Sequence, residues 1–275
     1  MLIKFGDNKL KHLLKNWDKV AKTIIPPLFF MTDFDGTLTP IVGRPEDAIL
    51  SEEMRKYISR LADLCPVAIV TGRALNDIKE MVGIEGIYYV GNHGFEISGP
   101  EIEWTKREAV QAKKVISDIC TSVEKKAGTI EGVLVENKGF TASVHYRLVE
   151  DEDVPKVKEI FRKATKPYEL EGEVRTSRGK KVLKIMPNLE WNKGEAISFL
   201  LESLELVEKP FPIYLGDDVT DEDAFRVLKR WKGLGILISG KEKVSEAKYR
   251  LDCVDEVKIF FEKLISHLGS RVDNK

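Results

Sequence analysis

Residues 28–37 read LFFMTDFDGT, an apolar run that passes directly into two carboxylates, a glycine and a threonine. Such a short, continuous apolar run predicts a strand that is buried on both faces of a sheet. Asp33 and Asp35 are two positions apart, so their side chains point the same way if the chain is still extended there. Gly36 permits a tight turn immediately afterwards. The stretch therefore predicts a buried strand that presents two carboxylates at its carboxyl end.

Similar apolar runs that end in polar residues recur along the chain, at 67–71, 87–90, 213–215 and 235–238. Residues with helical spacing follow the run at 67–71, over 74–81, and the run at 213–215, over 221–230. Short apolar strands that alternate with helices predict an α/β fold, with a doubly wound parallel sheet that helices cover on both faces.

The middle of the chain has a different pattern. Residues 104–126 and 154–165 have helical spacing, and two hairpins are predicted, from 133–136 with 142–147 and from 173–176 with 182–186. We therefore expect an inserted α/β domain at 99–188, with an antiparallel sheet and helices on one side, inside a core formed by 1–98 and 189–275. Amphipathic helices are also predicted at 8–22 and 255–268.

Composition excludes several classes of partner. The 275 residues include 44 basic and 45 acidic side chains, without the basic excess that nucleic acid or an anionic membrane favours. No apolar run approaches the roughly 20 residues that span a bilayer, and no signal peptide is predicted. Three widely spaced cysteines form no CxxC pair, which argues against zinc and predicts reduced thiols in a cytoplasmic protein. A monomer is the default expectation.

Further polar residues follow predicted strands or open a helix. In open parallel sheets, reactive groups gather beyond the carboxyl ends of the strands. Thr71, Asp217 and Asp218 have that position, and Lys193 opens a helix. Converging carboxylates, together with water, would hold Mg²⁺, a hard cation that prefers oxygen ligands.

This combination of residues fits phosphoryl transfer. Asp33 can attack phosphorus and form an acyl phosphate, and Asp35 can protonate the leaving sugar oxygen and then activate water. The Thr71 hydroxyl and the Lys193 ammonium can stabilise the equatorial oxygens as charge develops. A simple turn after a strand explains an isolated Asp-x-Asp-Gly-Thr motif, but it does not explain the whole set. We therefore predict a magnesium-dependent phosphatase with an aspartyl-phosphate intermediate.

Four motifs resemble, in this order, the haloacid dehalogenase-like phosphatase superfamily and, within it, the trehalose-6-phosphate phosphatases: DFDGTLTPI (33–41), VTGR (70–73), GNHGFEI (91–97) and LGDDVTDEDAF (215–225). The resemblance implies a doubly wound core with a mobile inserted cap, dependence on Mg²⁺, and hydrolysis of trehalose 6-phosphate to trehalose and phosphate. It also implies that Asp33 is the nucleophile and Asp35 the general acid and base.

For the metal, the resemblance implies that the Asp33 carboxylate, the Asp35 backbone carbonyl and Asp217 are ligands. Asp218 and Asp221 are supporting or alternative ligands. The sequence leaves open which aspartate of this group contacts Mg²⁺ directly.

Substrate contacts are predicted at six positions, Gly72, Arg73, Asn92, His93, Glu96 and Lys180. Several have simpler interpretations, because His93 and Glu96 also fit a capped turn and a basic hairpin tip such as Lys180 is usually solvated. The sequence departs from the resemblance in VLKIMP (182–187), where Lys184 stands at a position that usually holds Glu. A lysine there leaves the phosphatase chemistry unchanged and puts the exact sugar in question.

Three other functions stay open. The chain can be a phosphatase of another sugar or glycoside phosphate, or a phosphomutase that returns the phosphate to another hydroxyl. A binding or regulatory module that keeps the pocket without turnover is the alternative from a different class. The presence of every expected catalytic group argues against that last alternative.

Overall fold

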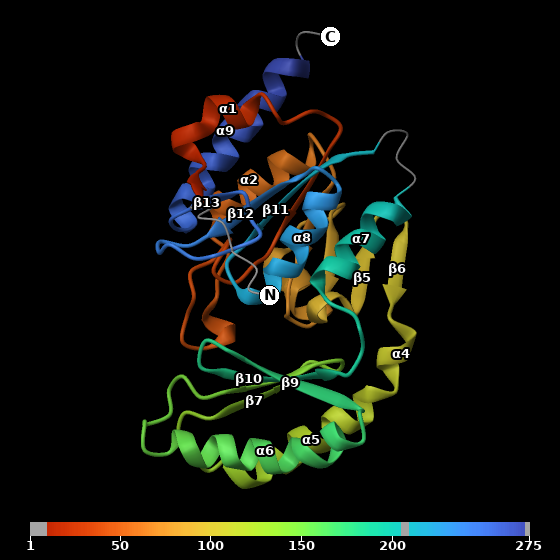
Figure 1. Ribbon diagram of the computed structural model, residues 1–275, viewed down its shortest axis with the longest axis vertical. Coiled ribbons are helices and arrows are strands. Elements are labelled where there is room, and N and C mark those ends of the chain that lie inside the picture. The colour runs from red at the N-terminus through yellow and green to blue at the C-terminus, as the bar shows by residue number, and fades with distance from the viewer. Residues whose placement is uncertain (1–9, 205–208, 273–275) are drawn as a thin grey trace, which may run out of the picture. The chain divides into compact units, whose positions relative to one another are not determined.

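The computed structural model describes residues 10–204 and 209–272, which form two compact units (Figure 1). The core unit contains the chain up to Glu103 and from Trp191 onward, and the inserted unit contains Trp104–Glu190. The sequence placed the insertion at 99–188. Strand β5 (Glu96–Gly99) pairs with β4 (Tyr88–Gly91), so the chain stays with the core sheet slightly longer.

The core unit is built on a nine-stranded sheet in the order β1-β13-β12-β11-β2-β3-β4-β5-β6. In this sheet order, the seven strands from β1 through β13, β12, β11, β2 and β3 to β4 are parallel to their neighbours. Strand β5 runs antiparallel to β4. The predicted doubly wound α/β core is thus confirmed, with an antiparallel extension at one edge. The remaining strands are β1 (Lys11–His12), β2 (Leu28–Thr32), β3 (Val67–Val70), β6 (Ile102–Thr105), β11 (Phe211–Gly216), β12 (Leu234–Ile238) and β13 (Tyr249–Leu251).

Helices cover both faces of this sheet. All five residues of β2 are buried, because alternate side chains point to opposite faces and each face carries helices. Phe30 meets Phe261 of α9 (Val254–Val272) at 5.2 Å between ring centroids, on the face that α9 shares with α2 (Glu52–Ala62). On the other face, Tyr214 packs edge-on against Phe225 of α8 (Glu222–Arg230), next to α7 (Lys193–Ser203). Helix α3 (Leu75–Val82) follows β3.

The beginning of the described chain differs from the helix predicted at 8–22. Residues 8 and 9 lie outside the described residues, and the segment that follows forms β1, a 3₁₀ turn at Leu14–Asn16 and the short helix α1 (Trp17–Ala21). Strand β1 adds to β13 at the sheet edge, and the Leu13 amide donates to the Arg250 carbonyl at 2.9 Å. Sheet pairing therefore outweighs helical spacing there. No helix in the described part of the chain is both long and apolar enough to cross a membrane.

The inserted unit pairs an antiparallel sheet with two long helices. Its strands are β7 (Leu134–Asn137), β8 (Ala142–His145), β9 (Val174–Gly179) and β10 (Val182–Pro187), in the order β7-β8-β10-β9. Helices α5 (Ala112–Ala127) and α6 (Val154–Leu170) lie on one side of that sheet, and the short α4 (Arg107–Val110) precedes them (Figure 1). Apolar side chains from the sheet and both helices form a separate core, which includes Val144, Leu183 and Ile116.

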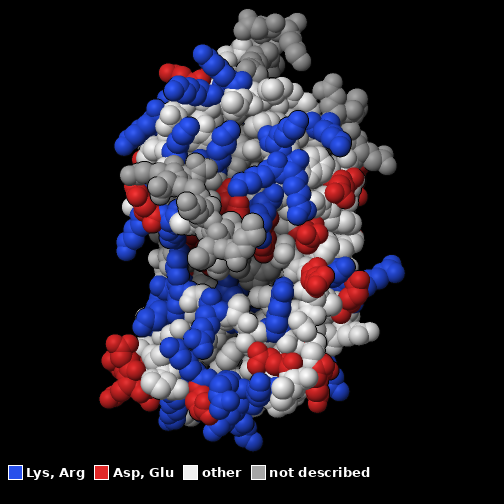
Figure 2. Space-filling view, in the orientation of Figure 1, with Lys and Arg blue, Asp and Glu red and all other residues white. Residues whose placement is uncertain are grey.

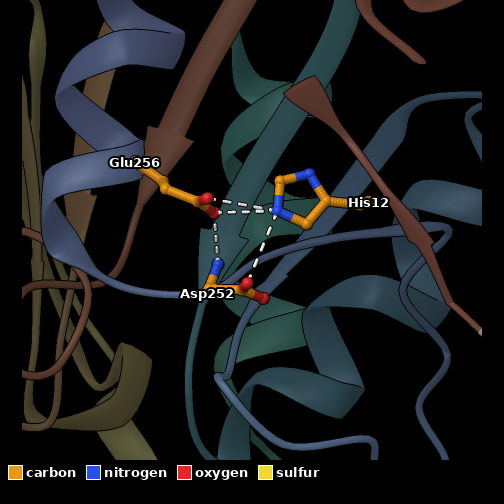
Figure 3. Close-up of side chains that lie close together, drawn as sticks. All are labelled: His12, Asp252 and Glu256. Atoms are coloured by element: carbon orange, nitrogen blue, oxygen red, sulfur yellow. Dashed lines mark hydrogen bonds and ion pairs between the residues drawn. The ribbon is translucent and has the colours of Figure 1, made fainter. Parts of the chain in front are cut away.

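A cluster of three polar side chains joins β1 to α9 (Figure 3). His12 Nε2 lies 3.2 and 3.1 Å from the two carboxylate oxygens of Glu256 and 3.6 Å from Asp252 Oδ2. Glu256 also accepts a hydrogen bond from the Asp252 amide at 2.6 Å, in the first turn of α9. These residue types can bind metals, but their contacts here already form a helix cap and a strand anchor. We therefore assign the cluster a structural role.

Replacement of His12 by alanine should weaken this anchor. The imidazole is largely buried, and a hydrogen bond to a charged partner contributes about 1–3 kcal/mol. We expect His12→Ala to lower the free energy of unfolding in urea by that amount. The matched control is Lys11→Ala on the same strand, whose side chain is exposed and should change stability by no more than about 0.5 kcal/mol. Equal stability of the two variants would show that the cluster anchors nothing.

Candidate active site

Asp33 occupies the carboxyl end of β2, where its amide donates to the Leu215 carbonyl of β11 at 2.8 Å. Its buried carboxylate accepts a hydrogen bond of 2.7 Å from Lys193 Nζ. Lys193 is the first residue of α7, and the preceding Asn192 caps this helix by accepting from the Glu195 amide at 3.0 Å. A helix cap on one element and a strand pairing on another therefore bring the two charges together.

Two further carboxylates complete the cluster. Oxygen atoms of Asp33, Asp217 and Asp221 lie within 4.8 Å of one another, and all three side chains are buried. Lys193 Nζ also donates to Asp221 Oδ1 at 2.8 Å, so one ammonium bridges two carboxylates. Asp217 follows β11, and Asp221 ends a 3₁₀ turn at Val219–Asp221.

The cluster carries more negative charge than its lysine balances. Burial is the main reason that the pKa of Asp33 lies well above its usual range, and the nearby Asp221 and Asp217 raise it further against the effect of Lys193. Burial alone would lower the pKa of Lys193, but the Asp221 and Asp33 carboxylates outweigh it and raise that pKa. Three carboxylates thus share a single ammonium. An oxygen-rich pocket of this charge fits a divalent cation.

Asp35 has a different environment from Asp33. Its carboxylate is 42% exposed and receives a bidentate pair from Arg73, with Nε at 2.8 Å and Nη2 at 2.7 Å. Arg73 Nη2 also donates to the Pro45 carbonyl at 2.8 Å, and the guanidinium lies 5.4 Å from the centre of the Phe34 ring. The buried Arg73 thus holds Asp35 in one orientation, and its predicted contact with substrate stays a prediction.

The ends of β3 and β4 are joined by backbone hydrogen bonds. The His93 amide donates to the Thr71 carbonyl at 2.9 Å, and the Asn92 amide donates to the Arg73 carbonyl at 2.7 Å. Asn92 and His93 both have positive φ, 50° and 57°, a strained backbone for residues other than glycine. The Asn92 side chain donates to Glu96 at 2.6 Å. Three of the predicted substrate residues, Asn92, His93 and Glu96, therefore lie in one constrained segment, which is hydrogen-bonded to the segment of Thr71 and Arg73.

Two glycines let the acidic side chains approach the backbone. A Cβ on Gly36, whose φ is +82°, would lie 2.5 Å from Asp217 Oδ2. A Cβ on Gly216 would lie 2.4 Å from Asp221 Cγ and 2.6 Å from Asp221 Oδ2. Real side-chain contacts do not come this close, so both positions require glycine while the aspartates stay where they are.

The other predicted residues have distinct places. Asp218 caps the turn at Val219–Asp221 and lies outside the group of three carboxylates, and its role as a metal ligand stays a prediction. Lys180 belongs to the inserted unit, where its carbonyl accepts from Arg147 at 2.7 Å, and its contact with substrate also stays a prediction. Tyr214, whose hydroxyl donates to Asp221 Oδ1 at 2.6 Å, was not predicted from the sequence. The only signal was a hydroxyl-bearing side chain in an otherwise apolar, largely buried strand.

The inserted unit has a polar sheet face of its own. Strand register places Glu136, Ser143, Lys184 and Ser177 side by side across the four strands, on the face opposite the apolar core. His145 Nε2 lies 2.9 Å from Glu136, and Lys138 Nζ lies 3.3 Å from it. Burial alone would raise the pKa of Glu136, but these two partners lower it to about 2, so the carboxylate stays charged.

The sequence matches known proteins along most of its length. The family model described as trehalose-phosphatase matches residues 31–255. Probable trehalose-phosphate phosphatase E of Arabidopsis thaliana is 40% identical over 251 residues, which cover 87% of this chain and 70% of that protein. Trehalose 6-phosphate phosphatase RA3 of Zea mays is 38% identical over 255 residues, with the same coverage of 87% and 70%.

Solved structures share the fold. The C-terminal domain of trehalose-6-phosphate phosphatase from C. albicans superposes with a TM-score of 0.76 at 23% identity, over 96% of this chain and 99% of that one. A haloacid dehalogenase-like hydrolase from Bacteroides thetaiotaomicron has a TM-score of 0.61 at 15% identity, over 86% of this chain and 99% of that one. At these identities the likeness shows the fold alone.

The close approach of Asp221 to Gly216 predicts the effect of a single methyl group. We expect Gly216→Ala to lower the free energy of unfolding by about 1–3 kcal/mol, because the added Cβ overpacks a buried contact with Asp221. Gly269→Ala is the matched control, since a Cβ there has no neighbour within 4 Å and alanine favours the helix by up to about 1 kcal/mol. Denaturant unfolding of both variants checks this. Wild-type stability of Gly216→Ala would contradict the packing of Asp221.

Proposed function

The chain belongs to the trehalose-phosphatase family, and on this premise we propose that it hydrolyses trehalose 6-phosphate to trehalose and phosphate through a phosphorylated Asp33. The observation that supports this proposal most directly is the carboxylate of Asp33, which lies at the end of β2 against the Lys193 ammonium. A carboxylate is a suitable nucleophile for phosphorus only where nearby positive charge reduces its repulsion from the phosphoryl group.

In the first half of the reaction, an Asp33 oxygen forms a bond to phosphorus as the bond from phosphorus to the sugar oxygen breaks. Asp35 gives its proton to that leaving oxygen. Its partial exposure suits a group that exchanges protons with solvent and substrate. Lys193 donates to the phosphoryl oxygens as charge develops on them.

In the second half, water attacks phosphorus of the acyl phosphate. Asp35 now accepts a proton from this water, and the bond from phosphorus to Asp33 breaks. Phosphate leaves, and both carboxylates return to their starting state. The reaction therefore consumes one water for each sugar phosphate and needs no other reactant.

We propose Mg²⁺ as the cofactor, held by Asp33 and Asp217 with the Asp35 carbonyl. The dense acidic cluster and its unbalanced charge support a divalent cation, and oxygen ligands suit Mg²⁺. When bound, the ion neutralises phosphoryl charge that would otherwise repel Asp33.

We further propose that the inserted unit recognises the sugar through its polar sheet face, with Glu136, His145 and Lys184. Charged and hydroxyl side chains in register offer several donors and acceptors to sugar hydroxyls. Figure 2 shows many Lys and Arg side chains on the surface of each unit, together with Asp and Glu.

The substrate is tested by phosphate release with Mg²⁺ from a panel: trehalose 6-phosphate, sucrose 6-phosphate, glucosylglycerol phosphate, mannosylglycerate phosphate and glucose 6-phosphate. We expect trehalose 6-phosphate to react fastest and Asp33→Asn to lose at least about 10³-fold in rate, since it lacks the nucleophile. Asp18→Asn, on the exposed side of α1, is the matched control and should keep wild-type rates.

The same panel separates the alternatives. Faster release from another member would keep the mechanism and change the substrate. An isomeric sugar phosphate instead of free phosphate would indicate a phosphomutase. Lys184→Glu should change the ranking of the sugars if this position contributes to recognition, and an unchanged ranking would remove Lys184 from the proposal.

The metal proposal predicts a binding effect that does not depend on turnover. Mg²⁺ should raise the Tm of the wild type, because a ligand that binds the folded state stabilises it. Asp217→Asn should abolish this shift. Asp218→Asn should retain it, because Asp218 caps a turn outside the carboxylate cluster. If neither variant shows the Mg²⁺-dependent rise in Tm, Asp218 is a metal ligand as well. If both variants show it, the ion binds at another site.

A further inference from the structure

Asp221 is the most enclosed member of the acidic cluster. Its side chain has no exposed surface, and it accepts four hydrogen bonds. Oδ1 accepts from Lys193 Nζ at 2.8 Å and from the Tyr214 hydroxyl at 2.6 Å. Oδ2 accepts from the backbone amides of Asp217 and Asp218, both at 2.9 Å. Each oxygen therefore already has two donors, which is the usual capacity of a carboxylate oxygen.

A carboxylate with both oxygens saturated is poorly suited to ligate a cation. To turn a lone pair toward an ion, Asp221 would have to give up a donor in a place that water does not reach, and an unsatisfied buried donor is unfavourable. Asp221 instead links groups that act on the substrate. Through Oδ1 it holds the ammonium that also contacts Asp33, and through Oδ2 it holds the backbone that carries Asp217.

Tyr214 supplies the one neutral side-chain donor in this arrangement. It lies in the middle of β11, fully buried, with its ring edge-on to Phe225 at 5.7 Å. Its neighbours in the strand, Ile213 and Leu215, are aliphatic. The ring alone would fill this space as phenylalanine, so the hydroxyl is the part of Tyr214 that packing does not explain.

We propose that Tyr214 is a positioning residue for phosphoryl transfer, acting through Asp221 on Lys193 and Asp217. This inference rests on the proposed phosphatase function and extends it to residues that do not touch the substrate. The hydroxyl occupies one side of Asp221 Oδ1 and prevents the carboxylate from rotating toward Lys193. Without it, Lys193 becomes the sole donor to that oxygen, and the ammonium is drawn toward Asp221 and away from Asp33.

The test compares two deletions of a buried tyrosine hydroxyl. Tyr214→Phe removes the donor to Asp221 and keeps the ring. Tyr89→Phe on β4 removes a hydroxyl that donates to the Ile84 carbonyl at 2.7 Å, away from the acidic cluster. Supporting partners of catalytic and metal sites typically contribute 10- to 100-fold. We expect Tyr214→Phe to lower kcat by about 10-fold or more with KM within about twofold, and Tyr89→Phe to keep both values.

Thermal unfolding provides the control for a general loss of stability. Both variants should lower the Tm by a similar amount, about 2–4 °C. If the Tyr214 hydroxyl contributed only to stability, Tyr214→Phe and Tyr89→Phe would have the same kcat. Equal kcat values, or a change confined to KM, would overturn the proposal.

A second measurement keeps the inference separate from the proposed function. Beryllium trifluoride with Mg²⁺ mimics a phosphorylated carboxylate, and its binding raises the Tm without any turnover. The wild type should bind it, and Tyr214→Phe should bind it about 10-fold more weakly than Tyr89→Phe does. A wild type that binds it but releases no phosphate from any sugar would refute the phosphatase and leave this inference standing. Equal binding by the two variants would refute the inference, whatever the activity.

Discussion

The buried ammonium of Lys193 between Asp33 and Asp221 is the interaction on which the rest of the site depends. A charge without access to water is tolerated only when it is paired and hydrogen-bonded. The end of β2, the turn that ends at Asp221 and the start of α7 must therefore meet in one arrangement. The parallel sheet makes this possible, because it brings the carboxyl ends of distant strands to a common edge. The same pairing leaves surplus negative charge, and that surplus suits a cation.

One residue type performs several tasks in this cluster because its surroundings differ. Asp33, Asp217 and Asp221 are all buried, and Asp221 is saturated by four donors. Asp35 is half-exposed and held by Arg73, and Asp218 caps a turn. The same chemical group can thus differ in reactivity from one position to the next, since burial and hydrogen bonding set what each carboxylate can do.

Close packing around the site restricts the backbone as strongly as the charges do. Gly36 and Gly216 leave room for aspartate side chains that a methyl group would displace. Asn92 and His93 keep positive φ angles that only the surrounding hydrogen bonds explain. The inserted unit has its own core and a separate polar sheet face. The two units can therefore vary independently in sequence, which fits a fold that solved structures of 23% and 15% identity share.

Local pattern in the sequence was enough to identify the strands that carry Asp33, Thr71 and Asp217, because buried parallel strands read as short apolar runs followed by polar residues. It also identified Lys193 at a helix start and the two hairpins of the inserted unit. Local pattern did not reveal β1, where pairing with β13 overrode helical spacing, nor the hydroxyl of Tyr214, and it left open whether Asp221 supports the site or binds the metal. The sequence thus determined which chemical groups reach the edge of the sheet. Tertiary structure alone decided which of them are saturated, paired or exposed, because hydrogen bonds between residues far apart in the chain leave no periodic signal in it.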